Sequence, residues 1–352
     1  MSAKDIFDVT IVGGGPAGLY AAFYAGLRGM KAKIVEAQGF LGGKINFYPE
    51  KMIWDVGGLP PVTGEELIRH LVRQGTTFDP AVVLNEKAEA IVREDGCFAL
   101  HAASGRVHYS KTVILAIGGG IVKPVKLQLS GAEKFEGANL HYTVKSYARF
   151  AGKTVLISGG GDSALDWAVE LADVAKKVVL VCRRDAFKGY EATVAKVREK
   201  GVVCLMNTEI EKLIAAGDRP AIGRVALRSH GDSAAKELEV DEVIVCHGYE
   251  REKELIRNSQ VDIRMKDEYC IDGSPLCETS APGIFAAGDC IHYGGKLYLI
   301  AGAFQDAANA VNRAKRFIEP DAASYAMVSS HNEAFKEKNK ELIKKMLAGT
   351  GV

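Results

Sequence analysis

The sequence predicts an α/β protein that is built from two Rossmann-like domains, with one domain inserted into the other. Two glycine-rich segments predict it: residues 13–18 read G-x-G-x-x-G, and residues 159–164 read G-x-G-x-x-A. Each segment follows an apolar run typical of a buried strand and precedes a helical pattern, which is the context that a dinucleotide-binding turn requires. A chain of 352 residues is long enough for two domains of ordinary size.

The first glycine segment, which follows the apolar run 9–12, predicts a phosphate-binding turn. Its first glycine permits a tight turn, its second lets the backbone approach a diphosphate, and its third lets the helix pack closely on the strand. The diphosphate would then lie against the free N–H groups of the helix N-terminus. The residues assigned to this turn are Gly13, Gly15, Pro16, Ala17 and Gly18.

An acidic residue completes the first unit. The segment 32–36 is expected to form its second strand and ends on Glu36. This position lies about 20 residues beyond the first glycine, where an acid accepts hydrogen bonds from ribose hydroxyls. Because a carboxylate repels a 2′-phosphate, the first site is expected to prefer FAD or NAD over NADP.

The second glycine segment follows the apolar run 155–158, and the strand expected at 178–182 ends on two arginines instead of an acid. Guanidinium groups bind phosphate through bidentate, charge-assisted hydrogen bonds, so this site is expected to bind NADPH rather than NADH. The alternative interpretation is a solvated basic turn. The residues assigned to the site are Gly159, Gly161, Asp162, Ser163, Ala164, Arg183, Arg184 and Lys188.

The composition and the cysteines limit the function classes. Hydrophobic residues make up 47% of the chain, and the formal net charge of +1 favours no nucleic-acid partner. The first strand begins so early that no signal peptide is expected, and no apolar run is long enough for a membrane span. Seven scattered cysteines without a C-x-x-C pair are typical of reduced thiols in the cytoplasm. Cys290 is interpreted as a buried spectator, and the eight histidines show no metal-binding spacing.

Two further strand-to-glycine junctions, at 112–120 and 279–289, resemble those of flavoproteins with two dinucleotide-binding domains. This resemblance implies that Asp289 hydrogen-bonds the ribityl chain of FAD. The alternative is that Asp289 caps the helix expected at 300–311. The order of the signals places an FAD-binding domain at 1–119 plus 252–352 and an NADPH-binding domain at 120–251.

Several segments outside the glycine turns carry a closer family resemblance. They are Tyr48-Pro49-Glu50-Lys51, Trp54-Asp55-Val56, Phe187 with Glu191, and Gly295-Lys296. With them, nearly the whole chain resembles the thioredoxin-reductase-like ferredoxin/flavodoxin–NADP(+) reductases of type 2. The segment around Tyr48 is the most specific, because the disulfide-reducing relatives lack it and carry a C-x-x-C pair that is absent here.

The resemblance implies further contacts to FAD. Tyr48 would stack on one face of the flavin ring, and Lys44 stands where the family usually has a glutamine beside FAD. A C-terminal extension at about 320–352 would cover the other flavin face in the partner subunit of a homodimer, with His331, Tyr325 or Phe335 as the ring cap. The alternative is a loop before a solvated helix at 332–347. The FAD contacts that the resemblance adds are Lys44, Tyr48, Ala88, Val122, Asp289 and Ser330.

The resemblance implies a mechanism that the cofactors carry, with no catalytic side chain. NADPH would deliver hydride to flavin N5, and the reduced flavin would pass single electrons to ferredoxin or flavodoxin. Two alternatives stay open: a disulfide or thioredoxin-type reductase that uses the non-adjacent Cys270 and Cys277, and an NADPH-binding flavoprotein sensor with little turnover.

Overall fold

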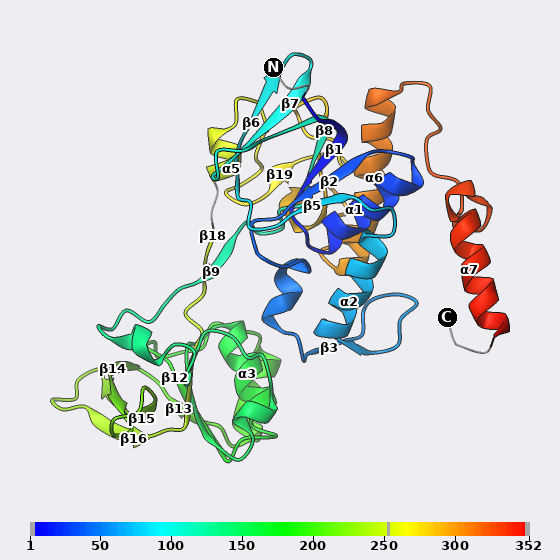
Figure 1. Cartoon of the computed structure of the whole chain (residues 1–352). Coiled ribbons are helices and arrows are strands. Elements are labelled where there is room, and N and C mark those ends of the chain that lie inside the picture. Colours follow the sequence, from blue (N-terminus) through cyan, green and yellow to red (C-terminus); the bar gives the residue numbers. More distant parts are fainter. Residues whose placement is uncertain (1–3, 252–253, 349–352) are drawn as a thin grey trace. The chain divides into compact units, whose positions relative to one another are not determined.

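The structure is a computed structural model that describes residues 4–251 and 254–348 (Figure 1). The chain forms two compact units. Unit 1 contains the chain up to Asn46, Met52–Ile121 and the chain from Arg251 onward, and unit 2 contains Phe47–Lys51 and Val122–Glu250. Both are α/β units with parallel strands, so the predicted fold class is confirmed.

A mixed sheet forms the centre of unit 1. Its strands are β1 (Ile6–Val12), β2 (Ala32–Val35), β5 (Ala81–Val83), β6 (Ala88–Glu94), β7 (Cys97–Ala102), β8 (Val107–Leu115) and β20 (Ile284–Ala286). They lie in the order β5-β2-β1-β8-β7-β6, and β20 also pairs with β8. The first half of β8 pairs antiparallel with β7, and its second half pairs parallel with β20. This switch lets a strand from late in the chain join the parallel part of the sheet.

Helices α1 (Pro16–Leu27) and α6 (Ile300–Ile318) pack against each other in unit 1. Small buried side chains on both helices, such as Ala21 and Ala307, allow a close approach. The remaining elements of unit 1 are η1 (Gly43–Phe47), β3 (Met52–Ile53), β4 (Val62–Thr63), α2 (Gly64–Gly75), α5 (Glu254–Asn258), β19 (Ile271–Asp272), η4 (Gly288–Cys290), β21 (Ile291–His292), η5 (Ser329–His331), η6 (Glu333–Phe335) and α7 (Lys336–Leu347).

Unit 2 is built on a parallel sheet in the order β10-β17-β11-β12-β13 and a separate antiparallel sheet in the order β14-β15-β16. Apolar residues from the two sheets, Val179 and Val225 among them, share one buried cluster. Trp167 of α3 lies in a second cluster. The elements are β9 (Val122–Pro124), η2 (Ala132–Phe135), β10 (Leu140–His141), η3 (Ala148–Phe150), β11 (Thr154–Ser158), α3 (Asp162–Leu171), β12 (Lys177–Val181), α4 (Glu191–Glu199), β13 (Val203–Leu205), β14 (Thr208–Ala215), β15 (Ile222–Ser229), β16 (Lys236–Glu239), β17 (Glu242–Val245) and β18 (Tyr249–Arg251).

The compact units differ from the predicted domain bounds by one or two residues at the two crossings and by one internal segment, Phe47–Lys51, which the prediction placed in the first domain. Thr143 Oγ1 donates a hydrogen bond to the Phe47 carbonyl, and the Tyr147 N–H donates to the Glu50 carboxylate. Lys51 Nζ lies 2.9 Å from a Glu170 carboxylate oxygen. These contacts bind the segment to unit 2, so the chain passes between the two units at two further points.

The described residues include neither a helix suited to cross a membrane nor a cluster of metal-ligating side chains. No helix combines the length and the apolar character that crossing a bilayer requires. Within the same residues, no group of three or more histidine, cysteine, aspartate or glutamate side chains is arranged to hold a metal ion.

Candidate functional site

The first glycine turn joins β1 to α1. Gly13 has φ +105°, and a Cβ atom at this position would lie 2.4 Å from the Ala116 carbonyl oxygen. A Cβ on Gly18 would lie 1.9 Å from the Gly13 carbonyl oxygen, so the turn closes against the first turn of the helix. α1 begins at Pro16 after Gly15, and no side chain caps its N-terminus. The N–H groups of its first turn are therefore available to an anion, and diphosphate binding there stays a prediction.

The carboxyl ends of four parallel strands surround this turn. Val12 of β1 lies in register with Val35 of β2 and Leu115 of β8, and Leu115 lies in register with Ala286 of β20. The loops that follow these strands are therefore at one edge of the sheet, which is where ligands bind in open α/β sheets.

Glu36 lies at this edge, directly after β2, and is 9% exposed. Its Oε2 accepts a hydrogen bond from the Gly14 N–H at 2.7 Å, and its Oε1 accepts one from the Gln38 N–H at 2.8 Å. The carboxylate is thus fixed beside the glycine turn by two backbone donors. The structure brings the predicted ribose-binding acid and the predicted phosphate-binding turn together.

The Glu36→Gln variant is expected to lower the free energy of unfolding by about 1–3 kcal/mol, because an amide has one acceptor oxygen and leaves one of the two N–H donors unsatisfied. The measurement is urea unfolding of the apoprotein followed by circular dichroism. Glu337→Gln is the matched control, since Glu337 is an exposed residue of α7. Equal stability of the Glu36 and Glu337 variants would show that the two hydrogen bonds contribute nothing.

Gly288 and Asp289 follow β20 at the same edge. A Cβ on Gly288 would lie 3.0 Å from the Cβ of Ala17, so this turn lies against the start of α1. Asp289 is exposed and lies in η4. The alternative prediction that Asp289 caps the following helix is wrong, because α6 begins at Ile300 and its N-cap is Leu299.

Two further residues of unit 1, Lys44 and Ala88, are predicted to contact FAD. Lys44 is exposed in η1, whose first residue, Gly43, lies against Gly15: a Cβ on Gly43 would be 2.8 Å from the Gly15 Cα. Ala88 begins β6, which is the edge strand and is separated from β1 by β7 and β8. The Glu86 N–H, two residues before Ala88, donates a hydrogen bond to the Glu36 carbonyl at 2.9 Å, so the chain that enters β6 lies beside the acid that follows β2.

Two predicted contacts lie with unit 2. Tyr48 packs against the apolar cluster that contains Trp167. Val122 begins β9, and its side chain lies outside the part of the chain that the structure describes.

The C-terminal tail lies along its own chain at the far end of α1. The Asn332 side chain donates a hydrogen bond to the Leu27 carbonyl, and the Phe335 ring lies 5.3 Å from that of Phe78. Ser330 Oγ is 3.1 Å from His331 Nδ1. Because Leu27 ends α1, the structure does not bring Ser330 and His331 to the glycine turn of the same chain. The expected C-terminal helix is present as α7 and has no buried residue.

The second glycine turn joins β11 to α3 in unit 2. A Cβ on Gly159 would lie 2.5 Å from the Cys246 carbonyl oxygen, and a Cβ on Gly160 would lie 2.4 Å from Cys182 Sγ. Gly161 precedes α3 without a side-chain cap, and Asp162 and Ser163 are exposed in its first turn. Ala164 is buried, which lets the helix pack on the sheet. Like the first turn, the second turn joins a parallel strand to a helix whose N-terminus no side chain caps.

Three cationic residues lie in the segment that follows β12, beside the second turn. Arg183 and Arg184 follow β12, which pairs in parallel with β11, and both are exposed. The Lys188 N–H donates a hydrogen bond to the Gly160 carbonyl at 2.6 Å. None of the three cationic side chains forms an ion pair with another described residue. The three side chains are therefore available to an anion, and NADPH binding by them stays a prediction.

Sequence reasoning missed His247 at the second site. It follows β17, another neighbour of β11, and its Nε2 is 2.8 Å from the Ser158 hydroxyl oxygen. Removal of the ring from water and the positive charge of Arg183 both lower the pKa of His247. The position of His247 shortly after the apolar run of β17 could have indicated it, since parallel strands place the residues that follow them at one edge of the sheet.

The thiols proposed for disulfide chemistry lie in different surroundings. Cys277 is fully buried, and burial raises the pKa of its thiol, which makes it unreactive. Burial also raises the pKa of Cys270, whose Sγ lies 4.0 Å from the Asp289 carbonyl oxygen. Cys290 is buried and donates to the Leu115 carbonyl at 3.1 Å. All seven cysteines are free.

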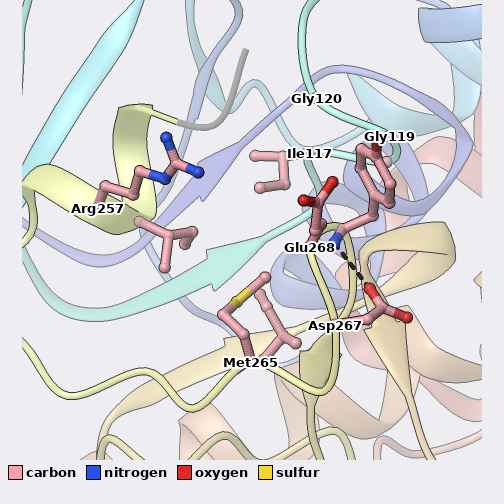
Figure 2. Close-up of a pocket in the computed structure, with 11 residues that line it drawn as sticks. Ile117, Gly119, Gly120, Arg257, Met265, Asp267 and Glu268 are labelled. Carbon is pink, nitrogen blue, oxygen red and sulfur yellow. Dashed lines mark hydrogen bonds between the residues drawn. The ribbon is translucent and has the colours of Figure 1, made fainter. Parts of the chain in front are cut away.

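A separate pocket of about 220 Å³ lies in unit 1 beside Gly118–Gly120 (Figure 2). Figure 2 shows Arg257 approaching it from α5, and Met265 and Glu268 from the segment before β19. The pocket is smaller than the roughly 300–1,000 Å³ of ordinary ligand sites, and none of the predicted cofactor residues lines it.

Comparisons with known proteins agree with this geometry. Residues 7–314 match the family model described as pyridine nucleotide-disulphide oxidoreductase. The chain is 60% identical to ferredoxin–NADP reductase 1 of Bacillus licheniformis, over 98% of this chain and 99% of that protein. It is 56% identical to ferredoxin–NADP reductase 2 of Exiguobacterium sibiricum, over 99% of each. The predicted family resemblance is confirmed.

Solved structures show the same fold. The thioredoxin reductase of T. acidophilum superimposes with a TM-score of 0.70 at 23% identity, over 89% of this chain and 98% of that chain. Lactococcus lactis thioredoxin reductase (FR conformation) superimposes with a TM-score of 0.69 at 23% identity, over 89% of this chain and 99% of that chain. At this identity the likeness concerns the fold alone.

Proposed function

The chain belongs to the pyridine nucleotide-disulphide oxidoreductase family, and we propose that it is a flavoprotein that passes electrons between NADPH and ferredoxin. One observation carries the proposal. Each glycine turn joins a parallel strand to a helix without a side-chain cap, but an acid follows the neighbouring strand in unit 1 and two arginines follow it in unit 2. The pair of sites thus suits one dinucleotide without a 2′-phosphate and one with it.

The residues of unit 1 fit FAD. The uncapped N-terminus of α1 offers N–H donors to a diphosphate, and the fixed Glu36 carboxylate can accept from ribose hydroxyls. Asp289 is exposed beside them, and its side chain forms no hydrogen bond or ion pair with another described residue. The close contacts of Gly13 and Gly18 leave no room for a side chain that would fill the cradle.

The residues of unit 2 fit NADPH. The N-terminus of α3 can hold a diphosphate, and Arg183, Arg184 and Lys188 can bind the 2′-phosphate. The chemistry that FAD supplies when bound is the exchange of an electron pair with NADPH for single electrons with an acceptor. The side chains of the protein bind and orient the two dinucleotides, and none of them needs to act as nucleophile, acid or base.

Several finer assignments are part of the proposal. Tyr48 stacks on the flavin ring, Lys44 adds a cation beside FAD, and Ala88 and Val122 contribute packing or backbone contacts. In a homodimer, Ser330 and His331 reach the second flavin face of the partner subunit. This role suits a tail that lies away from the glycine turn of its own chain. Flavodoxin is a second acceptor of the same kind, and the seven free thiols suit the cytoplasm.

NADPH-dependent reduction of cytochrome c, with and without ferredoxin, tests the proposed function. Strong stimulation by ferredoxin is expected, and a parallel assay with thioredoxin and a disulfide dye should show no thioredoxin-dependent turnover. The Cys270→Ser/Cys277→Ser double variant should keep its ferredoxin-dependent rate. Turnover with thioredoxin alone, lost in this double variant, would replace the proposal with a disulfide reductase. No turnover with any acceptor would favour a sensor.

A further inference from the structure

A fully buried carboxylate on α6 contacts the turn that carries Asp289. Asp306 has no exposed surface, and its Oδ2 accepts a hydrogen bond from the Gly288 N–H at 2.9 Å. The same Oδ2 is 2.6 Å from Lys296 Nζ, and Oδ1 accepts from the Tyr293 hydroxyl at 2.5 Å. All three donors come from the segment 288–296, which leads from β20 to α6.

The stability of the fold alone does not explain why Asp306 and Lys296 form a buried ion pair. The Lys296 side chain is 1% exposed, so both charges are removed from water. A buried ion pair is often no more stabilising than a pair of well-packed apolar residues. Burial raises the pKa of the Tyr293 hydroxyl, and the hydrogen bond to the Asp306 carboxylate raises it further because it holds the proton on the hydroxyl. The contacts of Asp306 with Gly288, Tyr293 and Lys296 fix the 288–296 segment at three points.

The fixed segment lies against the first glycine turn. Gly288 approaches Ala17 in the first turn of α1, and its backbone N–H donates to Asp306. Asp289 follows directly and is exposed. Its direction therefore depends on how Gly288 is held.

We infer that Asp306 is a positioning residue, which holds the Gly288–Asp289 turn against the N-terminus of α1 so that the Asp289 carboxylate is oriented toward FAD. The inference rests on the proposed function, because it takes FAD as the ligand of unit 1. Asp306 itself lies under the turn and touches no solvent. It acts through Gly288, and Lys296 balances its charge.

The test is a double-mutant cycle on FAD affinity. Apoprotein is titrated with FAD, and the dissociation constant is read from the quenching of flavin fluorescence. Asp306→Asn is expected to raise this constant about tenfold to a hundredfold, the range of one charge-assisted hydrogen bond, because asparagine is neutral and has one acceptor oxygen. In an Asp289→Ala background, the same substitution should change it by about threefold or less.

A purely structural role predicts a different result. Asp306→Asn would then weaken FAD equally in both backgrounds, or would lower the unfolding temperature of the apoprotein without changing FAD affinity. Either result would overturn the inference. Arg313→Gln is the matched control, since Arg313 also lies on α6 and pairs with Glu278 at 2.8 Å without contacting Gly288. Its FAD affinity should equal that of the unmodified chain.

A milder variant covers the case in which Asp306→Asn does not fold. Tyr293→Phe removes only the donor to Oδ1, and it should raise the FAD dissociation constant about threefold to tenfold, again only where Asp289 is present. The same effect in both backgrounds would contradict the inference. If the unmodified chain binds no FAD, the proposed function fails as well. If it binds FAD but no coupling to Asp289 appears, the inference alone fails.

Discussion

Replacing Arg183 and Arg184 together with alanine is expected to lower kcat/KM for NADPH by about a hundredfold or more, while kcat/KM for NADH stays within about threefold. Each charge-assisted hydrogen bond to a phosphate is worth about 1.5–3 kcal/mol, and 1.4 kcal/mol corresponds to a tenfold change. Both guanidinium groups are exposed, so the effect is expected near the lower end of this range. Because NADH lacks the 2′-phosphate, its kcat/KM is expected to change little.

Steady-state kinetics with a saturating artificial acceptor measures this change in preference. Arg219→Ala is the matched control, because Arg219 is an exposed arginine of the same unit outside the loop that follows β12. An equal loss for both nucleotides would mean that the arginines support the fold of the loop rather than bind the 2′-phosphate. An unchanged preference would assign the 2′-phosphate to other residues.

The Gly18→Ala variant is expected to lower the free energy of unfolding by about 2–3 kcal/mol and to raise the FAD dissociation constant at least about tenfold. Helix propensity alone predicts the opposite sign, because alanine is favoured over glycine in a helix by about 1 kcal/mol. The new Cβ would lie 1.9 Å from the Gly13 carbonyl oxygen. Backbone atoms cannot rotate away, so the glycine turn itself must move, at the cost of an overpacked core.

Urea unfolding of the apoprotein and titration with FAD measure the two effects. Gly57→Ala is the matched control: its Cβ would have no atom within 4 Å, and the backbone is not left-handed there. This control should stay within about 0.5 kcal/mol of the unmodified chain. A Gly18→Ala variant with greater stability and unchanged FAD affinity would show that the turn adapts to the side chain.

Local patterns were sufficient for the two βαβ units. The strands expected at 9–12 and 155–158 lie within β1 and β11, and the strand expected at 178–182 is β12 at Lys177–Val181. Continuous apolar runs indicate strands that are covered on both faces, and glycine at fixed offsets indicates the turn that follows. Glu36, Arg183 and Arg184 were predicted as site residues for the same reason, because they follow such runs.

Contacts between distant parts of the chain were not predictable in this way. Asp306 was missed because its partners, Gly288 and Lys296, are identified only once α6 is placed beside the β20 junction. The docking of Phe47–Lys51 on unit 2 depends on Thr143, Tyr147 and Glu170, far along the chain. The capping role considered for Asp289 failed because the helix begins eleven residues later, at Ile300.

The sequence by itself determined the fold class, the two glycine turns between strand and helix, and the contrast between an acid after one strand and arginines after the other. These features are short in sequence, and glycine geometry and strand periodicity specify them locally. Only the tertiary structure decided that Glu36 is held by two backbone donors, that Tyr48 packs with unit 2, and that a buried carboxylate supports the Asp289 turn. Such contacts form when folding brings residues far apart in sequence together, and no local pattern encodes them.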